Sequence, residues 1–197
     1  MNSCILLAAG SSTRFGSSKA LARIMGETVI ERLLDELLKS KLDEIIVVLG
    51  AHEQEIRPLI LKHKSIKVVY NKDHNLGQSS SFKCGLRALD QAGTGILLLP
   101  VDHPLLQAGT VDRLIAEFVQ AKAKVLIPTF NGKRGHPPVF SIDLLNEFLA
   151  LSDDRGINTV VHRHANETKE LAVKDPGVIK AFNTPQELES LRLREIS

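Results

Sequence analysis

The first segment that could do chemistry follows an apolar stretch near the start of the chain. Residues 7–19, LAAGSSTRFGSSK, contain two glycines, four serines and the cations Arg14 and Lys19. Glycines let a backbone approach an anion, free amides donate hydrogen bonds, and fixed cations neutralise phosphate charge. Five residues separate Gly10 from Gly16 and Lys19 comes three positions later, which fits neither a P-loop nor a dinucleotide fingerprint. The loop predicts a site for a nucleoside triphosphate or an equally phosphate-rich ligand.

Two oxygen-bearing side chains follow other apolar runs. Asp102 lies between two prolines in PVDHP, directly after the run GILLLP, and Asn183 begins NTPQEL. A rigidly held carboxylate suits Mg²⁺, which takes one or two carboxylates together with substrate phosphates. The alternatives are that Asp102 caps a turn or helix and that Asn183 starts the last helix. We expect His103 to be a loop residue rather than a ligand.

Two further segments carry polar groups that could contact a ligand. Ser79, Ser80 and Ser81 follow Gly77 where a helix should begin, so their amides and hydroxyls could meet an anion or the edge of a base. Helix capping explains one of these serines but not all three. Residues 132–140, GKRGHPPVF, place basic side chains and a histidine in a loop, for which plain exposure to solvent is the alternative.

Short apolar runs alternate with longer amphipathic segments, and these elements must position the side chains above. Each run is nearly continuous and rich in Ile, Val or Leu, as expected for strands covered on both faces. We expect strands at residues 4–9, 44–49, 66–70, 95–100, 124–128, 139–141, 168–173 and 178–182. We expect helices at 28–40, 52–63 with a break near Pro58, 79–92, 110–121, 143–151, 158–164 and 185–194.

Strand-helix-strand repeats imply parallel pairing with right-handed crossovers. The sequence therefore predicts an α/β fold, an open and mostly parallel sheet with helices on both faces. Ligands of such sheets bind outside the carboxyl ends of the strands, where the candidate residues fall. No long linker or internal repeat divides the chain, so we expect residues 1–197 to form one domain.

Composition excludes several kinds of partner. The formal net charge is +2, aromatic residues make up 4% of the chain and Trp is absent, which disfavours nucleic-acid and membrane partners. Cys4 and Cys84 are far apart and are expected to behave as small apolar residues. The start MNSCILLAAG has no basic region before its short apolar run, and no run reaches transmembrane length. We expect a cytoplasmic protein.

Taken together, LAAGxSxRxGxxK, PxDxP and the stretch NTPQEL resemble the motifs of the molybdenum cofactor nucleotidyltransferase family. The resemblance follows nearly the whole chain in order. It implies a Rossmann-like, nucleotide-diphospho-sugar transferase-like fold. It also implies that the terminal phosphate of a molybdopterin acceptor attacks the α-phosphate of a nucleoside triphosphate, with pyrophosphate leaving and Mg²⁺ as cofactor.

The same resemblance implies roles for individual residues. Arg14, Lys19 and Asp102 would be catalytic, and Asp102 and Asn183 would hold Mg²⁺, although an amide oxygen is a weaker ligand than a carboxylate. Residues facing the acceptor would be Arg134 and His136. The nucleotide would be contacted by Leu7, Ala8, Ala9, Gly10, Ser11, Ser12, Gly16, Gly77 and one or more of Ser79, Ser80 and Ser81.

The choice of base rests on Ala9. Family members that use GTP tend to read L-A-G-G, whereas those that use CTP read L-A-A-G, as this chain does. The resemblance thus favours cytidylyl transfer to molybdopterin, with a molybdoenzyme or its chaperone as a possible partner. Alternatives are guanylyl transfer to the same acceptor, nucleotidyl transfer to a sugar or alditol phosphate, and a non-catalytic carrier of the molybdenum cofactor.

Overall fold

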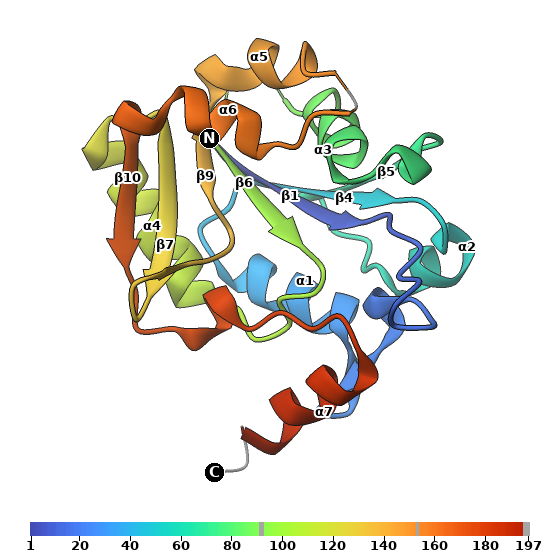
Figure 1. Cartoon of the computed structure of the whole chain (residues 1–197). Helices are drawn as coiled ribbons and strands as arrows, with labels where there is room; N and C mark the ends of the chain where they lie inside the picture. Colours follow the sequence, from blue (N-terminus) through green and yellow to red (C-terminus); the bar gives the residue numbers. More distant parts are fainter. Residues whose placement is uncertain (91–92, 153, 195–197) are drawn as a thin grey trace.

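The computed structural model describes residues 1–90, 93–152 and 154–194. An eight-stranded sheet lies at its centre, in the order β10-β7-β9-β6-β1-β4-β5, with β8 paired to β7 (Figure 1). Neighbouring strands are parallel except that β9 is antiparallel to β6 and β7, and β8 to β7. The strands are β1 (Asn2–Ala8), β4 (Glu44–Leu49), β5 (Ile66–Tyr70), β6 (Gly95–Pro100), β7 (Val125–Phe130), β8 (Lys133–Arg134), β9 (Val139–Ser141) and β10 (Thr168–Ala172).

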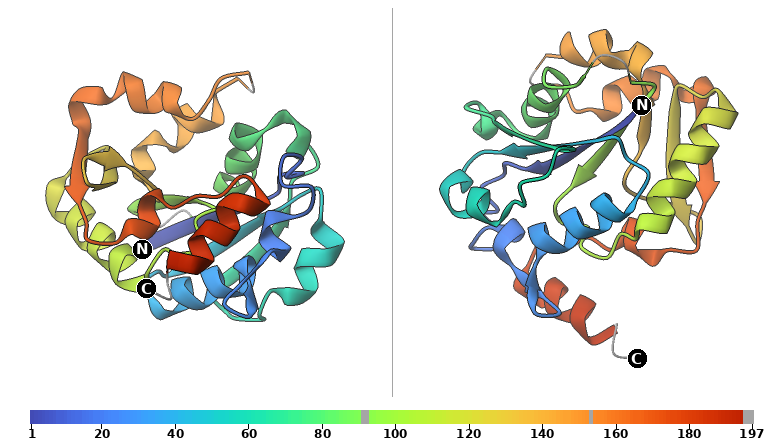
Figure 2. Two further views of the ribbon diagram at one scale, coloured as in Figure 1. Left: turned by 60° about the horizontal axis from the view of Figure 1, so that its bottom comes forward. Right: turned by 180° about the vertical axis from the view of Figure 1, so that it is seen from behind.

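Helices cover both faces of this sheet, as the further views of Figure 2 also show. The α-helices are α1 (Val29–Lys39), α2 (Glu53–Ile56), α3 (Gln78–Leu86), α4 (Ala108–Ala121), α5 (Leu145–Leu149), α6 (Asn158–Arg163) and α7 (Pro185–Arg194). The predicted α/β class and the open, mostly parallel, Rossmann-like sheet are therefore confirmed.

Alternate residues of β1 enter two separate apolar cores because successive side chains of a strand point to opposite faces. Cys4 and Leu6 pack in one core with buried residues of α1, α4 and α7. Ile5 and Leu7 pack in the other core with buried residues of α3, α5 and α6. Both faces of the strand are apolar, so β1 is held firmly at the point where the glycine-serine loop leaves it.

The helix α1 packs against one face of the sheet, beneath β1 in the view of Figure 1. Thr28 caps it in a capping box with Glu31, and its buried face carries the apolar stripe that predicts the helix. The Nε of Arg32, on this helix, donates a hydrogen bond to the carbonyl of Pro104 at 3.0 Å. The helix therefore also anchors the proline-flanked segment that carries Asp102.

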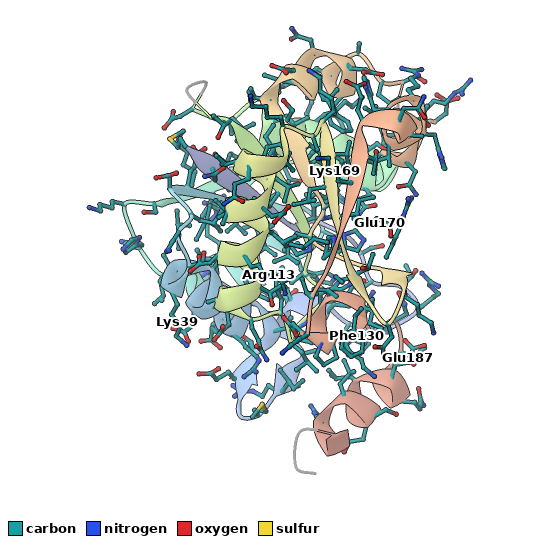
Figure 3. All side chains as sticks on the ribbon, turned by 90° about the vertical axis from the view of Figure 1, so that its left-hand side faces the viewer. Lys39, Arg113, Phe130, Lys169, Glu170 and Glu187 are labelled. Carbon is teal, nitrogen blue, oxygen red and sulfur yellow. The ribbon has the colours of Figure 1, made fainter. Side chains whose placement is uncertain are left out.

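The edge strand β10 differs from the central strands in its polarity. Lys169 and Glu170 are exposed on it and are labelled in Figure 3. Charged side chains on an edge strand discourage pairing with another chain. Glu170 also forms an ion pair with Arg134 at 2.7 Å, so this edge reaches the loop that follows β7.

Most predicted strands are found within one or two residues of their expected ends. The predicted strand at 178–182 is wrong, because Asp175 caps a 3₁₀ turn at Pro176–Ile179 and no strand follows it among residues 180–184. The helix expected at 52–63 is α2 followed by a 3₁₀ turn at Arg57–Leu59, because Pro58 has no N–H to continue a helix.

Three smaller differences concern boundaries. The helix predicted at 79–92 ends at Leu86, and the last two residues of that range lie outside the described residues. The loop at 132–138 contains the two-residue strand β8, and the helix expected at 143–151 is a 3₁₀ turn followed by α5. A hairpin of β2 (Arg23–Ile24) and β3 (Glu27–Thr28) was not predicted. Within the described ranges, no helix has the length and apolar character needed to cross a bilayer.

Candidate functional site

The loop after β1 opens into a pocket at the carboxyl edge of the sheet, which we call the first pocket. Its walls come from residues 7–10 and 18–20, from the start of α3 and from residues 100–102, and its volume is about 240 Å³. Gly16 has a φ of +81°, a conformation open to glycine, and it closes a turn in which its N–H donates to the carbonyl of Ser12. This turn sends the chain back toward the sheet and brings Lys19 over the end of β6.

Most residues expected to contact a nucleotide lie in this region. The first pocket is lined by Leu7, Ala8, Ala9, Gly10, Ser12, Gly77 and Ser81 from the expected set. Ser11 and Arg14 line an adjoining cavity that also includes Lys19 and Asn183. Gly16, Ser79 and Ser80 line neither of them. Arg14 is exposed, so its guanidinium is available to a ligand that extends out of the first pocket.

Three of the expected catalytic and metal-binding side chains meet at one point. The Lys19 ammonium Nζ donates to Asp102 Oδ2 at 2.8 Å and to Asn183 Oδ1 at 2.9 Å. We call this arrangement the Lys19 bridge. Its members come from the loop after β1, the segment after β6 and the segment before α7. A single cation therefore joins parts of the chain that are far apart in sequence.

Asp102 is mostly buried and remains ionised. Burial raises its pKa, but hydrogen bonds from His103 and Lys19 outweigh this effect and lower the pKa to about 2. His103 Nδ1 lies 3.0 Å from Asp102 Oδ1, so the two carboxylate oxygens are engaged by different partners. The structure thus keeps a negative charge at the rim of the first pocket throughout the neutral pH range.

The segment before α7 is held against the loop after β1. The N–H of Phe182 donates to the carbonyl of Asp102 at 3.1 Å, and its ring packs edge-on against Phe15 with centroids 5.3 Å apart. The Lys19 ammonium lies 5.6 Å from the centre of the Phe182 ring. The N–H of Asn183 bonds to Glu187, the residue that completes the cap of α7 and is labelled in Figure 3. These contacts fix the Asn183 amide.

The three serines at the start of α3 are used mainly inside the protein. Ser79 Oγ donates to the carbonyl of Arg155 at 2.8 Å, and Ser80 Oγ donates to the carbonyl of Asp73 at 2.8 Å. The amide of Asn71 donates to the hydroxyls of Ser80 and Ser81. All three serines are buried, and Ser81 alone of them lines the first pocket. These contacts fix the start of α3, where Gly77 has a φ of +95°.

A second pocket lies beside the first and contains the residues expected to face the acceptor. Arg134 and His136 line it together with apolar side chains such as Leu98, Ile127 and Phe140. Gln78 lines both pockets, so they adjoin at the start of α3. Arg134 also pairs with Glu170, which leaves the charge of this wall largely balanced.

His136 is held as a neutral imidazole. Burial and the nearby His103 lower its pKa to about 4. Its Nδ1 is buried without a hydrogen-bond partner in the described part of the chain, and its ring centre lies 4.8 Å from that of His103. His103 therefore contacts Asp102 on one side and His136 on the other, linking the edge of the first pocket to the wall of the second.

Two residues of the site, His103 and Asn71, were not predicted from the sequence. His103 lies in a loop as expected, but it is 6% exposed and its ring contacts both a carboxylate and a second histidine. Its position next to Asp102 was the available signal. Asn71 follows β5 and orders the start of α3, which only its place at a strand end could have indicated. Gln78, which precedes the helix expected at 79–92, was likewise not singled out.

The residues present fit a divalent cation. Asp102 and Asn183 direct a carboxylate oxygen and an amide oxygen toward the same ammonium group, which shows that a positive charge is accommodated between them. Oxygen donors of this kind suit Mg²⁺ and Mn²⁺. Across the described residues, no group of three or more His, Cys, Asp and Glu side chains could hold a metal by themselves. A metal at this position would take its other ligands from phosphates and water.

Comparison with known proteins agrees with this geometry. Residues 4–168 match the MobA-like NTP transferase domain family. Purine catabolism protein PucB of Bacillus subtilis is 28% identical over 198 residues, covering 95% of this chain and 94% of that protein. A probable UDP-N-acetylglucosamine pyrophosphorylase of Acanthamoeba polyphaga mimivirus is 32% identical over 131 residues, covering 64% of this chain and 51% of that protein. The chain thus spans about half of the mimivirus relative and nearly all of the Bacillus one.

Solved structures share the whole fold. The homologue of Mycobacterium tuberculosis Rv0371c from Mycobacterium sp. strain JC1 has a TM-score of 0.86 and 26% identity, covering 99% of this chain and 96% of that chain. Rv0371c in complex with manganese has a TM-score of 0.80 and 27% identity, covering 98% of each chain. The molybdopterin-guanine dinucleotide biosynthesis protein A of Archaeoglobus fulgidus, at 16% identity and a TM-score of 0.76, supports the fold alone; 98% of each chain is covered.

The family match covers most of the chain. It includes the loop after β1, the strands β1, β6 and β7 beside the two pockets, and Asp102. It confirms the resemblance found in the motifs at the level of this broader family. The chain belongs to the MobA-like NTP transferase domain family and is a nucleotidyltransferase.

Proposed function

We propose that the protein transfers CMP from CTP to the terminal phosphate of a molybdopterin-type acceptor and releases pyrophosphate. The observation that carries the transfer reaction is the Lys19 bridge, which lies at the rim of the first pocket, and a second pocket adjoins the first at Gln78. Nucleotidyl transfer needs two adjoining substrate sites with charge control between them. The two pockets meet this requirement.

The nucleophile is already an anion, so the reaction requires no dedicated general base. Catalysis then depends on positioning the two phosphates and on neutralising the charge that repels the attack. The loop amides after Gly10 hold the triphosphate, exposed Arg14 contacts its outer phosphates, and Lys19 stabilises the transferring phosphoryl group. When bound between Asp102 and Asn183, Mg²⁺ or Mn²⁺ supplies further neutralisation of the phosphate oxygens.

The second pocket supports an acceptor that combines an uncharged ring system with a phosphate. Its apolar walls suit a ring such as that of a pterin, and Arg134 in the same wall could exchange its exposed partner Glu170 for a phosphate. His136 also lines this pocket, but its Nδ1 is buried, so the histidine shapes the wall rather than offering that nitrogen to a ligand.

The preference for CTP rests on a smaller feature. Ala9 lines the first pocket, but it is only 2% exposed, and its methyl carbon lies within 2.9 Å of where a Cβ on Gly50 would stand. The methyl group is therefore packed tightly at the end of β4 and narrows the pocket only slightly. One methyl group contributes about 1–3 kcal/mol of discrimination at most. We expect a preference for CTP rather than strict exclusion of GTP.

Two other functions are distinguished by one experiment. The mimivirus relative is named as a sugar-nucleotide pyrophosphorylase, which favours a sugar phosphate as the alternative acceptor. A carrier that binds the cofactor without transferring a nucleotide is the other. Pyrophosphate release should be measured for CTP, GTP, UTP and ATP against molybdopterin, N-acetylglucosamine 1-phosphate and an alditol phosphate, with Mg²⁺ or Mn²⁺.

We expect release with CTP and molybdopterin to exceed every other combination. If pyrophosphate is released mainly with UTP and a sugar phosphate, the reaction is still nucleotidyl transfer, but the acceptor is a sugar phosphate rather than molybdopterin. If molybdopterin binds but no combination releases pyrophosphate, the carrier function is correct and the proposed reaction is wrong. An Asp102→Asn variant measured in parallel identifies any release that comes from a contaminating enzyme.

A further inference from the structure

The Lys19 bridge places an ammonium group between the two side chains proposed to hold the metal. Lys19 Nζ lies 2.8 Å from Asp102 Oδ2 and 2.9 Å from Asn183 Oδ1. The other carboxylate oxygen of Asp102 is engaged by His103 at 3.0 Å. Every oxygen that these two side chains direct toward the site therefore already has a positively polarised partner.

A divalent ion cannot share this position with the ammonium group without strong repulsion. Mg²⁺ binds oxygen at about 2.0–2.1 Å, closer than the ammonium does, so both cations would compete for the same oxygens. The bridge is also largely shielded, with side-chain exposures of 14% for Lys19 and 22% for Asp102. Water screens such a pair less well than one on the open surface. Metal binding thus requires Lys19 to leave.

Lys19 has an alternative partner once a nucleotide is bound. Its side chain lines both the first pocket and the adjoining cavity that contains Arg14, so it can turn from Asp102 toward a phosphate in either space. A phosphate offers charge-assisted hydrogen bonds comparable to those that the ammonium group would give up. The same movement would leave the oxygens of Asp102 and Asn183 open.

We propose that Lys19 acts as an internal cation that occupies the metal position until the nucleotide draws it away. This proposal rests on the proposed function, and it sets an order in which the site assembles. The protein without nucleotide binds divalent metal weakly, and the metal enters with the nucleotide or after it. Because binding free energies are linked, metal and nucleotide then strengthen each other's binding through Lys19 as well as through direct contact.

The test measures Mn²⁺ binding to nucleotide-free protein by electron paramagnetic resonance of the free ion. Lys19→Met removes the charge at similar side-chain length, and Lys19→Gln is a second neutral variant in case the first disturbs the fold. Lys19→Arg keeps the charge. Arg14→Met removes a charge from the exposed part of the same loop and controls for a general change in potential. Circular dichroism checks the fold of each variant.

We expect both neutral variants to bind Mn²⁺ about tenfold more tightly than the unaltered protein, as for loss of one charge-assisted contact. Lys19→Arg should remain weak, and Arg14→Met should change the affinity by less than about threefold because its charge is exposed. Equal Mn²⁺ affinity in the unaltered protein and the neutral variants would overturn the proposal.

Asp102→Asn separates this inference from the proposed function. If Asp102→Asn removes Mn²⁺ binding while the Lys19 variants bind as the unaltered protein does, the metal position is right and the competition is wrong. If Asp102→Asn leaves Mn²⁺ binding intact in the Lys19→Met background, Asp102 is not a metal ligand. That outcome overturns both the metal assignment and the competition between Lys19 and the metal.

Discussion

The two pockets adjoin at the same edge of the sheet, but they are built from different interactions. The rim of the first pocket holds an ionised carboxylate, a lysine and an amide joined by short polar contacts. The second pocket has apolar walls, a neutral histidine and an arginine whose charge is paired with Glu170. Charged groups therefore dominate the rim of the first pocket, whereas apolar packing dominates the second.

This difference indicates how the family could change substrates without changing its chemistry. Substitutions in the second pocket would alter its packing and hydrogen bonds without touching the charges that we propose act on the phosphates. His103 is the exception, because it contacts Asp102 and the ring of His136. Single substitutions on each side can test whether the division between the pockets holds, beginning with the largest expected effect.

Replacing Asp102 with Asn should have the largest effect. It removes the only carboxylate of the Lys19 bridge, so we expect kcat/KM to fall by at least about a thousandfold, which corresponds to the several kcal/mol a metal site contributes. Initial rates of pyrophosphate release measure this change. Asp143→Asn is the matched control, because Asp143 forms an exposed pair with Lys124 away from both pockets. Comparable loss in both variants would contradict the assignment.

Replacing Lys19 with Met should lower kcat by roughly a hundredfold while changing the KM for the nucleotide by less than about threefold. On nucleotide binding the phosphate contact of the ammonium is offset by the Asp102 contact that it gives up, so its net effect falls on the transition state. Single-turnover rates and equilibrium nucleotide binding separate the two quantities. Lys169→Met, on the exposed edge strand in Figure 3, serves as the control. A change confined to nucleotide affinity would make Lys19 a binding residue only.

For the second pocket, we expect the free energy of unfolding to depend on pH through His136. His136 has a folded-state pKa of about 4 and an ordinary value near 6.5, so the unfolded chain binds the extra proton first as the pH falls. The stabilisation is complete above pH 6.5 and is lost between pH 6.5 and about 4. We expect this loss to reach up to about 3 kcal/mol.

Denaturant unfolding of the unaltered protein and of His136→Gln at pH 7 and pH 4 measures that contribution. Glutamine does not titrate, so the variant should lose less free energy of unfolding over this interval. The low pKa of Asp102 affects both proteins equally, and most of its contribution is lost below pH 4. Identical losses would show that His136 is not held neutral by the fold.

The smallest effect is expected for Ala9→Gly. Because the Ala9 methyl is almost fully buried against the end of β4, its removal should raise the ratio of GTP to CTP turnover by no more than about tenfold. The measurement is kcat/KM for each nucleotide with the same acceptor. An unchanged ratio would remove Ala9 from base selection without affecting the assignment of the transfer reaction.

The sequence was most informative where local pattern decides structure. Continuous apolar runs bounded by turn residues predicted β4, β5, β6 and β9 at their observed ends. The apolar run at 178–182 predicted a strand that is absent there, because the adjacent Pro-Gly pair and buried Asp175 form a 3₁₀ turn instead. The cap itself is local, but Gln107 and Thr110 hold the Asp175 carboxylate in place, and local composition cannot indicate those contacts.

The site was predictable by residue type more than by contact. The loop, Asp102 and Asn183 were named from their motifs, but nothing local indicates that one ammonium joins all three segments. The serines of α3 show the opposite case, since their hydroxyls turn inward to bond with Asn71, Asp73 and Arg155. Whether a polar side chain faces a ligand or the protein is decided by tertiary packing.

The segment that carries Phe182 and Asn183 has a consequence for biosynthesis. Lys19 and Asn183 are 164 positions apart, and every strand of the central sheet precedes Asn183 in the chain. During synthesis every strand of the sheet therefore emerges from the ribosome ahead of the residue that completes the Lys19 bridge. The core that contains α3, α5 and α6 is complete in sequence before Asn183, whereas the other core still needs Leu188 and Leu191 of α7. The second half of the hydrophobic packing and the Lys19 bridge are therefore completed by the same last segment of the chain.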